Sequence, residues 1–376
     1  MKKIRVLEVI RQGQIGGGES HLLDLIDGFG PDVEPVVLSF TSGHMIDQLT
    51  AKGVKCKVLD TGKAFDLKVI RSINRLIREE RIELVHAHGS RAASNLLFSC
   101  FWLKIPLLYT VHGWSFHPDQ SLLVQKLRGW SERLICHRSA GVICVSESNR
   151  KTGVDAFGLK HAQVIENGVN LKRFATLPER TKMRASLGFT DHDFVMGFVG
   201  RMTLQKDPLT FLKALALAHA KDARVKGLLV GDGDMKEAVH TYIRENQMEG
   251  MLVVTGYRTD IPEVFSAMDV FCLPSLWEGL SIALLEAMAS ALSVVVTPTD
   301  GAKEIIQDGK NGFLMNFKKA EDLSEKVLIL LEHPEKRSFL ASNAQKLILE
   351  RFDSKSVSQK VERMYTEIIG KWKQQH

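Results

Sequence analysis

Residues 270–296 read VFCLPSLWEGLSIALLEAMASALSVVV. The stretch begins with a short apolar run, Val270–Leu273, and ends with another, Ser293–Val296; such runs are typical of buried β-strands. Between them, after a loop, lies an apolar segment of helical length at 283–290. Parallel strands need a long crossover connection, so a strand, a helix and a strand in this order predict a parallel βαβ unit. The stretch therefore predicts an α/β fold.

The same alternation runs through the rest of the chain. In the first half, strands are predicted at 4–10, 36–40, 55–59, 84–88, 107–111 and 142–145, and helices at 19–29, 46–52, 67–80 and 91–102. In the second half, further strands are predicted at 194–199, 226–230 and 252–255, and helices at 207–220, 235–246 and 261–268. Each half thus predicts its own parallel sheet, covered by helices on both faces.

A change of pattern separates the two halves. Residues 164–169 predict a strand that ends in an Asn-Gly turn signal, and polar sequence follows, so the linker is placed near 170–185. The predicted domains are 1–176 and 177–351. The tail, 352–376, predicts an amphipathic helix, whose apolar side carries Val357, Val361, Met364, Tyr365, Ile368 and Ile369.

The composition is that of a globular protein with enough apolar residues for two cores. The chain has 376 residues, of which 44% are hydrophobic and 25% charged, ordinary values for a soluble fold. The formal net charge of +6 suits an enzyme that handles phosphates or a protein on an anionic membrane. No nucleic-acid-binding signature appears, so no nucleic-acid partner is expected.

Cysteine usage and hydropathy indicate the compartment. The five cysteines include no CxxC pair, which is typical of reduced thiols in a cytoplasmic protein. The most apolar segment, 96–111, is interrupted by Lys104 and Pro106 before it reaches the ~20 residues of a membrane span. We therefore predict a cytoplasmic protein without a spanning helix.

Two glutamates in the opening stretch form the strongest functional pattern. Glu278 lies in the loop after the first strand, beside Gly279, which lets the backbone approach a ligand. Leu280 and Ser281 open the next helix, whose N-terminal amides favour an anion. Glu286 lies about two turns further along, where it can bind hydroxyl groups. A capped helix with a surface glutamate is the structural alternative.

Two cations follow a strand of the second half. Gly200 and Arg201 come directly after the strand at 194–199, and Lys206 follows in the same loop. At the carboxyl end of a parallel sheet, two cations can neutralise a diphosphate and the charge that develops on a leaving group. The alternative is a pair of solvated loop cations.

A glycine loop precedes the first helix. It contains the contiguous residues Gly16, Gly17 and Gly18, whose amides can hold a phosphate or a sugar. Their spacing is not the GxGxxG pattern of dinucleotide binding, which argues against an NAD-dependent dehydrogenase. A tight strand-to-helix turn would also use glycine.

A second set of turn residues lies in the second half. Gly231 and Gly233 end the strand at 226–230 and predict a tight turn under a nucleotide, with a plain turn as the alternative. Tyr257 and Arg258 follow the strand at 252–255 and could flank a base.

Three histidines lie at strand ends. Alternation places His86 and His88 on one face of their strand; such a pair can bind a metal, but no carboxylate or cysteine partner is apparent, so no metal site is predicted. His112 follows the strand at 107–111 and is predicted to contact a ligand, with helix capping or core packing as the alternative.

Together these residues resemble family 4 of the glycosyltransferases over nearly the whole chain. The resemblance implies the GT-B architecture, in which two Rossmann-like, doubly wound parallel-sheet domains face each other across a cleft. A C-terminal helix then crosses back to the first domain. The first domain would receive the acceptor, and the second would hold the nucleotide sugar.

The resemblance also implies residue roles. Glu278 would contact the donor sugar and Glu286 the ribose hydroxyls, while Arg201 and Lys206 would bind the diphosphate. His112 would contact the donor sugar, and the glycine loop would approach the diphosphate.

The implied activity is retaining transfer of a hexose-type sugar from a nucleotide-diphosphate sugar. The donor would be a UDP-sugar or a GDP-sugar, and a UDP-sugar is favoured over GDP-mannose. The acceptor would be a glycan or a lipid-linked glycan in cell-surface polysaccharide biosynthesis. Same-face attack, with the leaving phosphate accepting the proton, needs no general base, no divalent metal and no further cofactor. The sequence departs from the family at 291–293, where Gly-x-Pro is usual, and at 300–304, where relatives often have two glycines.

Two predicted helices carry cations interleaved with apolar residues. At 67–81 these are Lys68, Arg71, Arg75 and Arg78 with Leu67, Ile70, Ile73 and Ile77; at 122–138 they are Lys126, Arg128, Arg133 and Arg138 with Leu123, Leu127, Trp130 and Leu134. Both helices could lie on the anionic inner face of the cytoplasmic membrane and meet a lipid-linked acceptor. An ordinary surface helix with a solvated basic face is the alternative.

Two other functional classes compete. A sugar-nucleotide epimerase shares the two-domain architecture, but the glutamates with Arg201 and Lys206 fit transfer better than elimination. A nucleotide-binding module without catalysis would have no use for all of Glu278, Arg201 and Lys206.

Overall fold

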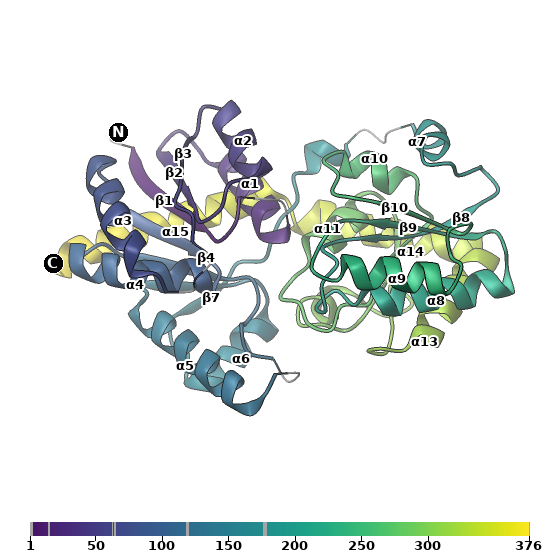
Figure 1. Ribbon diagram of the computed structural model, residues 1–376. Helices are drawn as coiled ribbons and strands as arrows, with labels where there is room; N and C mark the ends of the chain where they lie inside the picture. The colour runs from purple at the N-terminus through teal and green to yellow at the C-terminus, as the bar shows by residue number, and fades with distance from the viewer. Residues whose placement is uncertain are drawn as a thin grey trace. The chain divides into compact units, whose positions relative to one another are not determined.

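The computed structural model describes residues 3–13, 16–61, 63, 65–117, 120–175 and 179–375. The chain forms two compact units (Figure 1). Unit 1 comprises Met1–Gly168 and Ser354–His376, and unit 2 comprises Val169–Asp353. The first division thus lies after Gly168, earlier than the predicted boundary at residue 176.

Unit 1 is built on a seven-stranded, fully parallel sheet with the order β3-β2-β1-β4-β5-β6-β7. Its strands are β1 (Ile4–Ile10), β2 (Val33–Ser39), β3 (Lys55–Val58), β4 (Leu84–His88), β5 (Leu107–Val111), β6 (Gly141–Cys144) and β7 (Ala162–Val164). The order reverses between β1 and β4, and ligands of such sheets bind beyond the carboxyl ends of the strands at this switch point. The predicted strand at 164–169 is wrong, since β7 ends at Val164.

Successive strand residues point to opposite sides of this sheet, so both of its faces carry apolar side chains. Helices cover both faces. On one face Leu7 and Val9 pack with α3 (Leu67–Glu79), α4 (Ser90–Leu103) and α5 (Leu122–Arg138). On the other, Val6 and Ile10 pack with α1 (Gly17–Gly28), α2 (His44–Ala51) and the tail helix α15 (Ser354–Gln375). The remaining helix, α6 (Glu147–Phe157), begins at the Ser146 cap and was not predicted.

The tail helix confirms the amphipathic prediction. All six of its predicted apolar residues are buried in the core of unit 1, namely Val357, Val361, Met364, Tyr365, Ile368 and Ile369. Unit 1 therefore depends on a segment that follows unit 2 in the chain.

Unit 2 repeats the plan with six parallel strands in the order β10-β9-β8-β11-β12-β13. They are β8 (Phe194–Val199), β9 (Val225–Val230), β10 (Leu252–Thr255), β11 (Val270–Leu273), β12 (Ser293–Val296) and β13 (Phe313–Leu314). The helical segments are η1 (Leu171–Phe174), α7 (Arg180–Ser186), α8 (Pro208–Lys221), α9 (Lys236–Glu245), α10 (Ile261–Ser266), α11 (Ile282–Ala289), α12 (Ala302–Ile305), α13 (Ala320–Glu332) and α14 (Pro334–Arg351). The opening βαβ unit, β11–α11–β12, is present as predicted.

The segment assigned to a linker contains a helix that is anchored in unit 2. The Arg184 side chain of α7 is almost fully buried, and its guanidinium donates to the carbonyl oxygens of Ala267, Thr190 and Asp193 and to the Asp269 carboxylate. A charged residue that is buried this way resembles a linker residue in sequence, because the carboxylate that neutralises it, Asp269, is 85 residues away along the chain.

The ends of unit 2 lie side by side. The Val169 amide donates to the Phe352 carbonyl at 2.8 Å, and Val169 forms a parallel bridge with Asp353. Unit 2 is thus a contiguous insertion whose entry and exit are adjacent.

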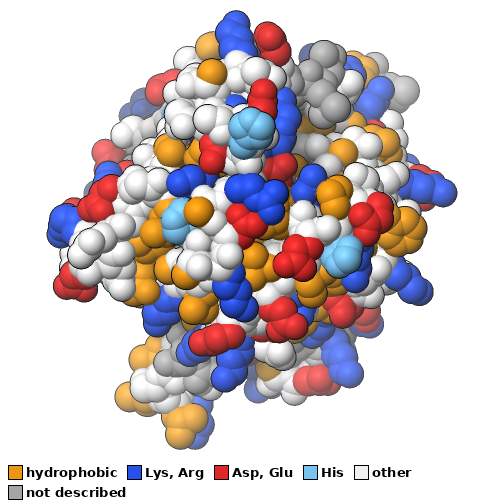
Figure 2. Space-filling model, turned by 90° about the vertical axis from the view of Figure 1, so that its right-hand side faces the viewer, with side chains coloured by type: hydrophobic (Ala, Val, Ile, Leu, Met, Phe, Trp, Pro, Cys, Tyr) orange, Lys and Arg blue, Asp and Glu red, His pale blue; other side chains and the backbone are white. Residues whose placement is uncertain are grey.

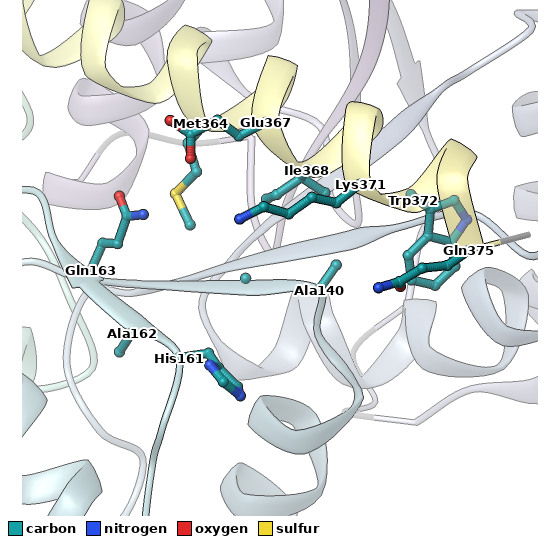
Figure 3. A pocket seen from close by; sticks show the side chains of 11 residues that line it. Ala140, His161, Ala162, Gln163, Met364, Glu367, Ile368, Lys371, Trp372 and Gln375 are labelled. Atoms are coloured by element: carbon teal, nitrogen blue, oxygen red, sulfur yellow. The ribbon is translucent and has the colours of Figure 1, made fainter.

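A pocket of about 440 Å³ opens in unit 1 beside α15 (Figure 3). Ala140 and His161, which precede β6 and β7, line it together with Ile368 and Trp372 of the helix. It lies at the amino ends of these strands, away from the edge where such sheets bind ligands.

Across the described ranges, the helices are too short or too polar to span a bilayer.

Candidate functional site

Two loops meet at the carboxyl edge of the unit 2 sheet, one after β8 and one after β11. They are joined through the backbone: the Leu276 amide donates to the Gln205 carbonyl at 2.7 Å, and Gln205 Nε2 donates to the Trp277 carbonyl at 2.9 Å. Lys206 and Glu278, one from each loop, form an ion pair, and both side chains are mostly buried. Ser275 Oγ donates to Glu278 Oε1 at 3.2 Å. Two residues that the sequence singled out separately are therefore neighbours.

Arg201 lies in the same loop as Lys206 and is exposed. Within the described ranges its guanidinium has no carboxylate at salt-bridge distance, so its charge is available to a ligand. An ideal Cβ on Gly200 would lie 3.6 Å from Lys206 Cε, an ordinary contact, so this glycine is not demanded by the packing. The loop thus offers one cation that is paired with a carboxylate and one that is open to solvent.

The N-terminus of α11 faces the same loop region. Ser281 is its N-cap residue, yet the side chain caps no amide, and in the part of the chain that the structure describes its buried hydroxyl has no hydrogen-bond partner. An unsatisfied buried hydroxyl is costly. Together with the amides of a helix N-terminus, it favours an anion at this point.

Glu286 lies further along α11 and is almost buried. Arg173 Nη1 of η1 lies 3.6 Å from Glu286 Oε1. Burial raises the pKa of Tyr257 to about 12, and both Arg173 and Glu286 are close enough to act on that pKa. The three side chains therefore form one polar cluster. Arg173 was missed because it falls in the segment taken for the linker.

The glycines of this edge serve close backbone contacts. Gly231 has a φ of 140°, and an ideal Cβ there would lie 2.0 Å from the Gly200 carbonyl oxygen. A Cβ on Gly233 would lie 2.4 Å from the Met202 oxygen, and one on Gly301 would lie 2.2 Å from the Gly279 oxygen. These contacts support the plain-turn alternative for Gly231 and Gly233, since loop packing alone requires them.

The Arg258 side chain forms an ion pair within its own loop. Its guanidinium is bonded to Asp260, two residues along the chain. The predicted contact to a base would have to compete with this ion pair.

Unit 1 carries a buried polar network centred on Glu8. Glu8 Oε1 accepts from Tyr365 Oη at 2.6 Å, and Glu8 Oε2 lies 2.9 Å from His88 Nε2 and 3.2 Å from His86 Nδ1. The remaining His86 nitrogen lies 2.7 Å from Thr110 Oγ1. The prediction that the histidine pair has no carboxylate partner was wrong; Glu8 was overlooked because it stands alone in an apolar strand.

This network contains perturbed ionisable groups. Burial alone would raise the pKa of Glu8, but the neighbouring His86 and His88 bring it below its usual value. Burial, aided by His86, lowers the pKa of His88 to about 4. Burial also lowers the pKa values of His21 and His112 well below the usual 6.5. These imidazoles are therefore neutral at physiological pH.

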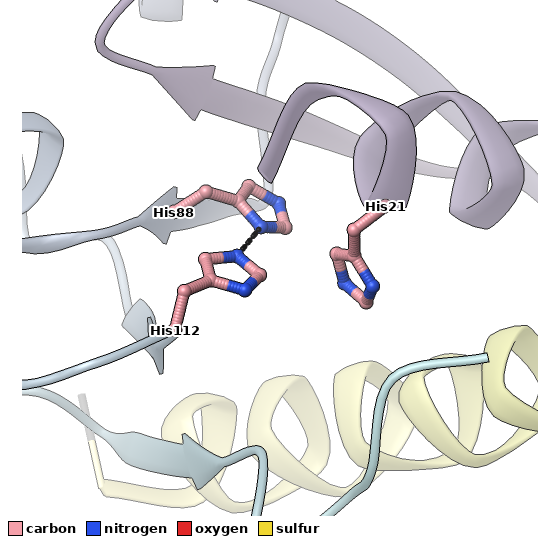
Figure 4. Close-up of side chains that lie close together, drawn as sticks. All are labelled: His21, His88 and His112. Atoms are coloured by element: carbon pink, nitrogen blue, oxygen red, sulfur yellow. Dashed lines mark hydrogen bonds between the residues drawn. The ribbon is translucent and has the colours of Figure 1, made fainter. Parts of the chain in front are cut away.

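His112 stands at the carboxyl edge of the unit 1 sheet, directly after β5. Its Nε2 lies 3.3 Å from His88 Nδ1, and its ring lies against that of His21, a residue of α1 (Figure 4). Three histidines, His21, His88 and His112, have a ligand nitrogen each within 4.8 Å of the others. Sequence reasoning missed His21, which is buried in a helix with no accompanying motif.

The glycine loop lies at the start of α1. Gly16 is the extended N-cap residue, and Gly17 and Gly18 begin the helix. A Cβ on Gly18 would meet only Ile10 Cδ1, at 3.8 Å, so the packing leaves room for it. The preceding Gly13 is the more constrained position, since its Cβ would lie 2.6 Å from the Thr41 oxygen.

Charges on the molecular surface are mixed on the face drawn in Figure 2, where cationic, anionic and apolar side chains are interspersed. The positive net charge of the chain is therefore not gathered on that face.

Two family profiles match the chain. The one described as "Glycosyltransferase Family 4" matches residues 15–173, and the one described as "Glycosyl transferases group 1" matches residues 179–347. Between them they cover most of both units.

Curated relatives and solved structures agree with these matches. A UDP-Gal:alpha-D-GlcNAc-diphosphoundecaprenol alpha-1,3-galactosyltransferase of Escherichia coli is 28% identical over 318 residues, 81% of this chain and 80% of the relative. An N,N'-diacetylbacillosaminyl-diphospho-undecaprenol alpha-1,3-N-acetylgalactosaminyltransferase of Campylobacter jejuni is 27% identical over 323 residues, 81% of this chain and 82% of the relative. The crystal structure of Anabaena Alr3699/HepE in complex with UDP and glucose has a TM-score of 0.87 at 23% identity, covering 97% and 100% of the two chains. At that identity the structural likeness concerns the fold alone.

Proposed function

The chain belongs to glycosyltransferase family 4 and has the GT-B fold, and on this premise we propose that it transfers a hexose-type sugar from a UDP-sugar to a lipid-linked or glycan acceptor with retention of configuration. The observation that carries the proposal is the pairing of Lys206 with Glu278 beside the open charge of Arg201. Cations bind a diphosphate and a carboxylate accepts strong hydrogen bonds from sugar hydroxyls, and this edge of unit 2 supplies both.

The donor would bind by exchanging protein contacts for its own. The diphosphate takes Lys206 from Glu278, and the released carboxylate accepts hydrogen bonds from the sugar hydroxyls. The amides and the unpartnered Ser281 hydroxyl at the start of α11 bind phosphate oxygens. Further along α11, Glu286 accepts from the ribose hydroxyls, and Arg173 holds its carboxylate in position.

The chemical step breaks the bond between the anomeric carbon and the β-phosphate oxygen. The acceptor hydroxyl forms the new bond on the same face, and its proton passes to the departing phosphate. Arg201 and Lys206 stabilise the negative charge that develops on the diphosphate. Because these cations supply the stabilisation, the reaction is proposed to need no divalent metal. Because the departing phosphate takes the proton, it is proposed to need no protein general base. The family resemblance assigns His112 to the donor sugar.

The names of the relatives support the choice of substrates. The Escherichia coli relative is named for UDP-galactose and a diphosphoundecaprenol-linked acceptor, and the Campylobacter relative for a diphospho-undecaprenol-linked acceptor. We propose the same substrate classes for this chain, and with them a role in polysaccharide biosynthesis.

Helix α5 supports a membrane-bound acceptor. It exposes Leu122, Leu123, Leu127 and Trp130, with 75%, 69%, 60% and 66% of each residue accessible. Its exposed cations are Lys126, Arg128, Arg133 and Arg138, while its only acidic residue, Glu132, is buried. An apolar, cationic face with a tryptophan fits the surface of an anionic leaflet. By contrast, Ile73 and Ile77 of α3 are buried in the core, so α3 is the weaker candidate.

The test is product analysis with purified protein, a panel of UDP- and GDP-sugars and a polyprenyl-diphosphate-linked sugar acceptor. The expected outcome is an acceptor-dependent product that keeps the donor's anomeric configuration by NMR, formed equally well with excess EDTA. Inversion would refute the stereochemical proposal, and loss of activity in EDTA would refute metal independence. An epimerised donor formed without acceptor would favour the epimerase.

A further inference from the structure

We propose that His21, His88 and His112 form a binding site for one transition-metal ion of the Zn²⁺ class at the carboxyl edge of the unit 1 sheet. The three side chains come from α1, from the end of β4 and from the residue after β5, and they converge (Figure 4). Their ligand nitrogens all lie within 4.8 Å of one another. The three ring centroids are 4.9, 5.5 and 5.7 Å apart, so each ring lies close to the other two.

Glu8 prepares His88 to act as a ligand. Both oxygens of this carboxylate accept hydrogen bonds, Oε1 from Tyr365 Oη and Oε2 from His88 Nε2. The proton of His88 therefore resides on Nε2, which leaves a lone pair on Nδ1. A carboxylate behind a ligating histidine fixes the tautomer and ring orientation in established metal sites.

The spacing of one pair of these nitrogens fits the ion. Zn²⁺ binds histidine nitrogens at about 2.0–2.1 Å in tetrahedral geometry, which places two such nitrogens about 3.3–3.4 Å apart. His88 Nδ1 and His112 Nε2 are 3.3 Å apart. When the ion binds, the proton between them moves to His112 Nδ1, so both imidazoles stay neutral. His21 supplies the third nitrogen, and water can take the fourth position because His112 is only half-buried.

A second group of potential ligands, Glu8, His86 and His88, serves as support rather than as a site. Both nitrogens of His86 are engaged, Nδ1 with Tyr365 Oη and Nε2 with Thr110 Oγ1. The ion therefore belongs on the side of His88 that faces His112.

The consequence for activity rests on the proposed function. His112 is the residue assigned to the donor sugar, and an ion held by its nitrogen removes that contact. The ion would thus inhibit transfer rather than assist it, which agrees with a reaction that needs no metal.

The test is calorimetric titration of EDTA-treated full-length protein with Zn²⁺, and with Co²⁺ as a spectroscopic probe. One ion per chain is expected, and Co²⁺ should show the intense visible bands of four-coordinate geometry. His21→Ala should weaken binding at least ~10-fold, and Glu8→Gln about 10- to 100-fold, as for other residues behind a ligand. His137→Ala, which removes an exposed histidine of α5, should bind as the wild type does. Circular dichroism checks that each variant is folded.

The proposal is overturned if the wild type binds no ion, or if binding is the same in His21→Ala or equally lost in His137→Ala. These titrations contain no donor, so they decide the metal site whatever the protein transfers. In assays of transfer, Zn²⁺ should lower the rate of the wild type far more than that of His21→Ala. Zn²⁺ bound by the three histidines without any effect on transfer would uphold the site and exclude His112 from the donor contact.

Discussion

At the scale of single residues, Asp269 organises the beginning of the unit 2 sheet. Its carboxylate accepts from the guanidinium groups of Arg180 and Arg184 and from the Val195 amide. Arg184 is buried, and desolvation lowers its pKa although Asp269 opposes the shift. A buried cation of this kind depends on its partner, because losing the carboxylate leaves an uncompensated charge.

We predict that Asp269→Ala lowers the free energy of unfolding by about 3–5 kcal/mol, the usual effect of breaking a buried ion pair. Urea denaturation followed by circular dichroism measures the change. Asp234→Ala, at an exposed position, should stay within ~0.5 kcal/mol of the wild type. Equal stability of the two variants would show that the Asp269 ion pairs contribute little.

Arg201 and Glu286 should differ in which step they affect. Arg201→Ala removes the cation that we propose to act on the leaving group, so kcat should fall about 100- to 1,000-fold. Glu286→Gln removes the charge of the proposed hydrogen bonds to the ribose and should raise the Kd of the donor about 10-fold or more. Kinetics and calorimetry separate the two effects, with Glu249→Gln at an exposed position as the control. Wild-type values in both variants would exclude this site.

Most residues of the candidate site in unit 2 could be singled out from the sequence, because they follow a strand or lie in or beside the helix after it, in a recognisable motif. Their pairing could not, since Lys206 and Glu278 come from loops of different βα units. Arg173 and His21 carried no local signal at all. Their roles depend on neighbours that only the folded chain supplies.

At the scale of elements, the contact between α1 and α15 depends on a small residue. An ideal Cβ on Gly28 would lie 2.2 Å from Ser358 Oγ and 2.8 Å from Ser358 Cβ. Ser358 itself is buried and donates to the Leu25 carbonyl at 3.0 Å. The close packing of the tail helix against α1 therefore requires glycine at position 28.

Gly28→Ala should destabilise unit 1 by about 1–3 kcal/mol, the usual effect of overpacking. Gly370→Ala is the matched control in α15, because a Cβ there meets nothing within 4 Å. It should be neutral or stabilise the helix by about 0.5–1 kcal/mol. Thermal and urea denaturation of both variants check the prediction, which fails if they change stability in the same direction.

Replacing two exposed leucines of α5, Leu123→Ser with Leu127→Ser, should reduce binding to anionic liposomes at least ~10-fold, since each leucine contributes about 1.5–3 kcal/mol when it is buried. Flotation at low salt, with anionic and with zwitterionic vesicles, measures the binding. Leu349→Ser, on α14 of unit 2 and also exposed, should bind as the wild type does. Absence of wild-type binding to anionic vesicles would exclude the membrane contact.

Helices whose apolar residues recur at regular helical spacing could be predicted from the sequence, and helices without such a pattern could not. The tail helix has apolar residues at helical spacing, whereas α6 buries only Asn149 and Gly153. Helix α7 was hidden by its charges, because the partners that neutralise Arg184 lie far along the chain.

At the scale of the complete chain, the two units differ in whether they are built from one continuous segment or from two. Unit 2 is one continuous segment with adjacent ends, whereas unit 1 needs both the first part of the chain and the tail. The two-sheet architecture was predictable from the repeated βα alternation. The dependence of the first segment on the last could be predicted only in part, from the apolar side of the tail helix.

We predict that residues 169–353 fold by themselves and bind UDP, as measured by circular dichroism and calorimetry. Residues 1–168 without the tail should fail to form a cooperative fold, because the apolar face that α15 covers would be exposed to water. Adding residues 354–376 as a separate peptide should restore protection from proteolysis. A stable fold of residues 1–168 alone would refute the dependence.

The discontinuity of unit 1 has a consequence for biosynthesis. A ribosome delivers the chain from its N-terminus, so all of unit 2 must emerge before the segment that completes unit 1 is made. During that interval the core cluster that contains Val6, Val37 and Leu108 lacks the apolar side chains that the tail contributes to it. We expect a nascent chain in this state to bind chaperones, and slow translation of the codons for residues 354–376 to prolong its exposure.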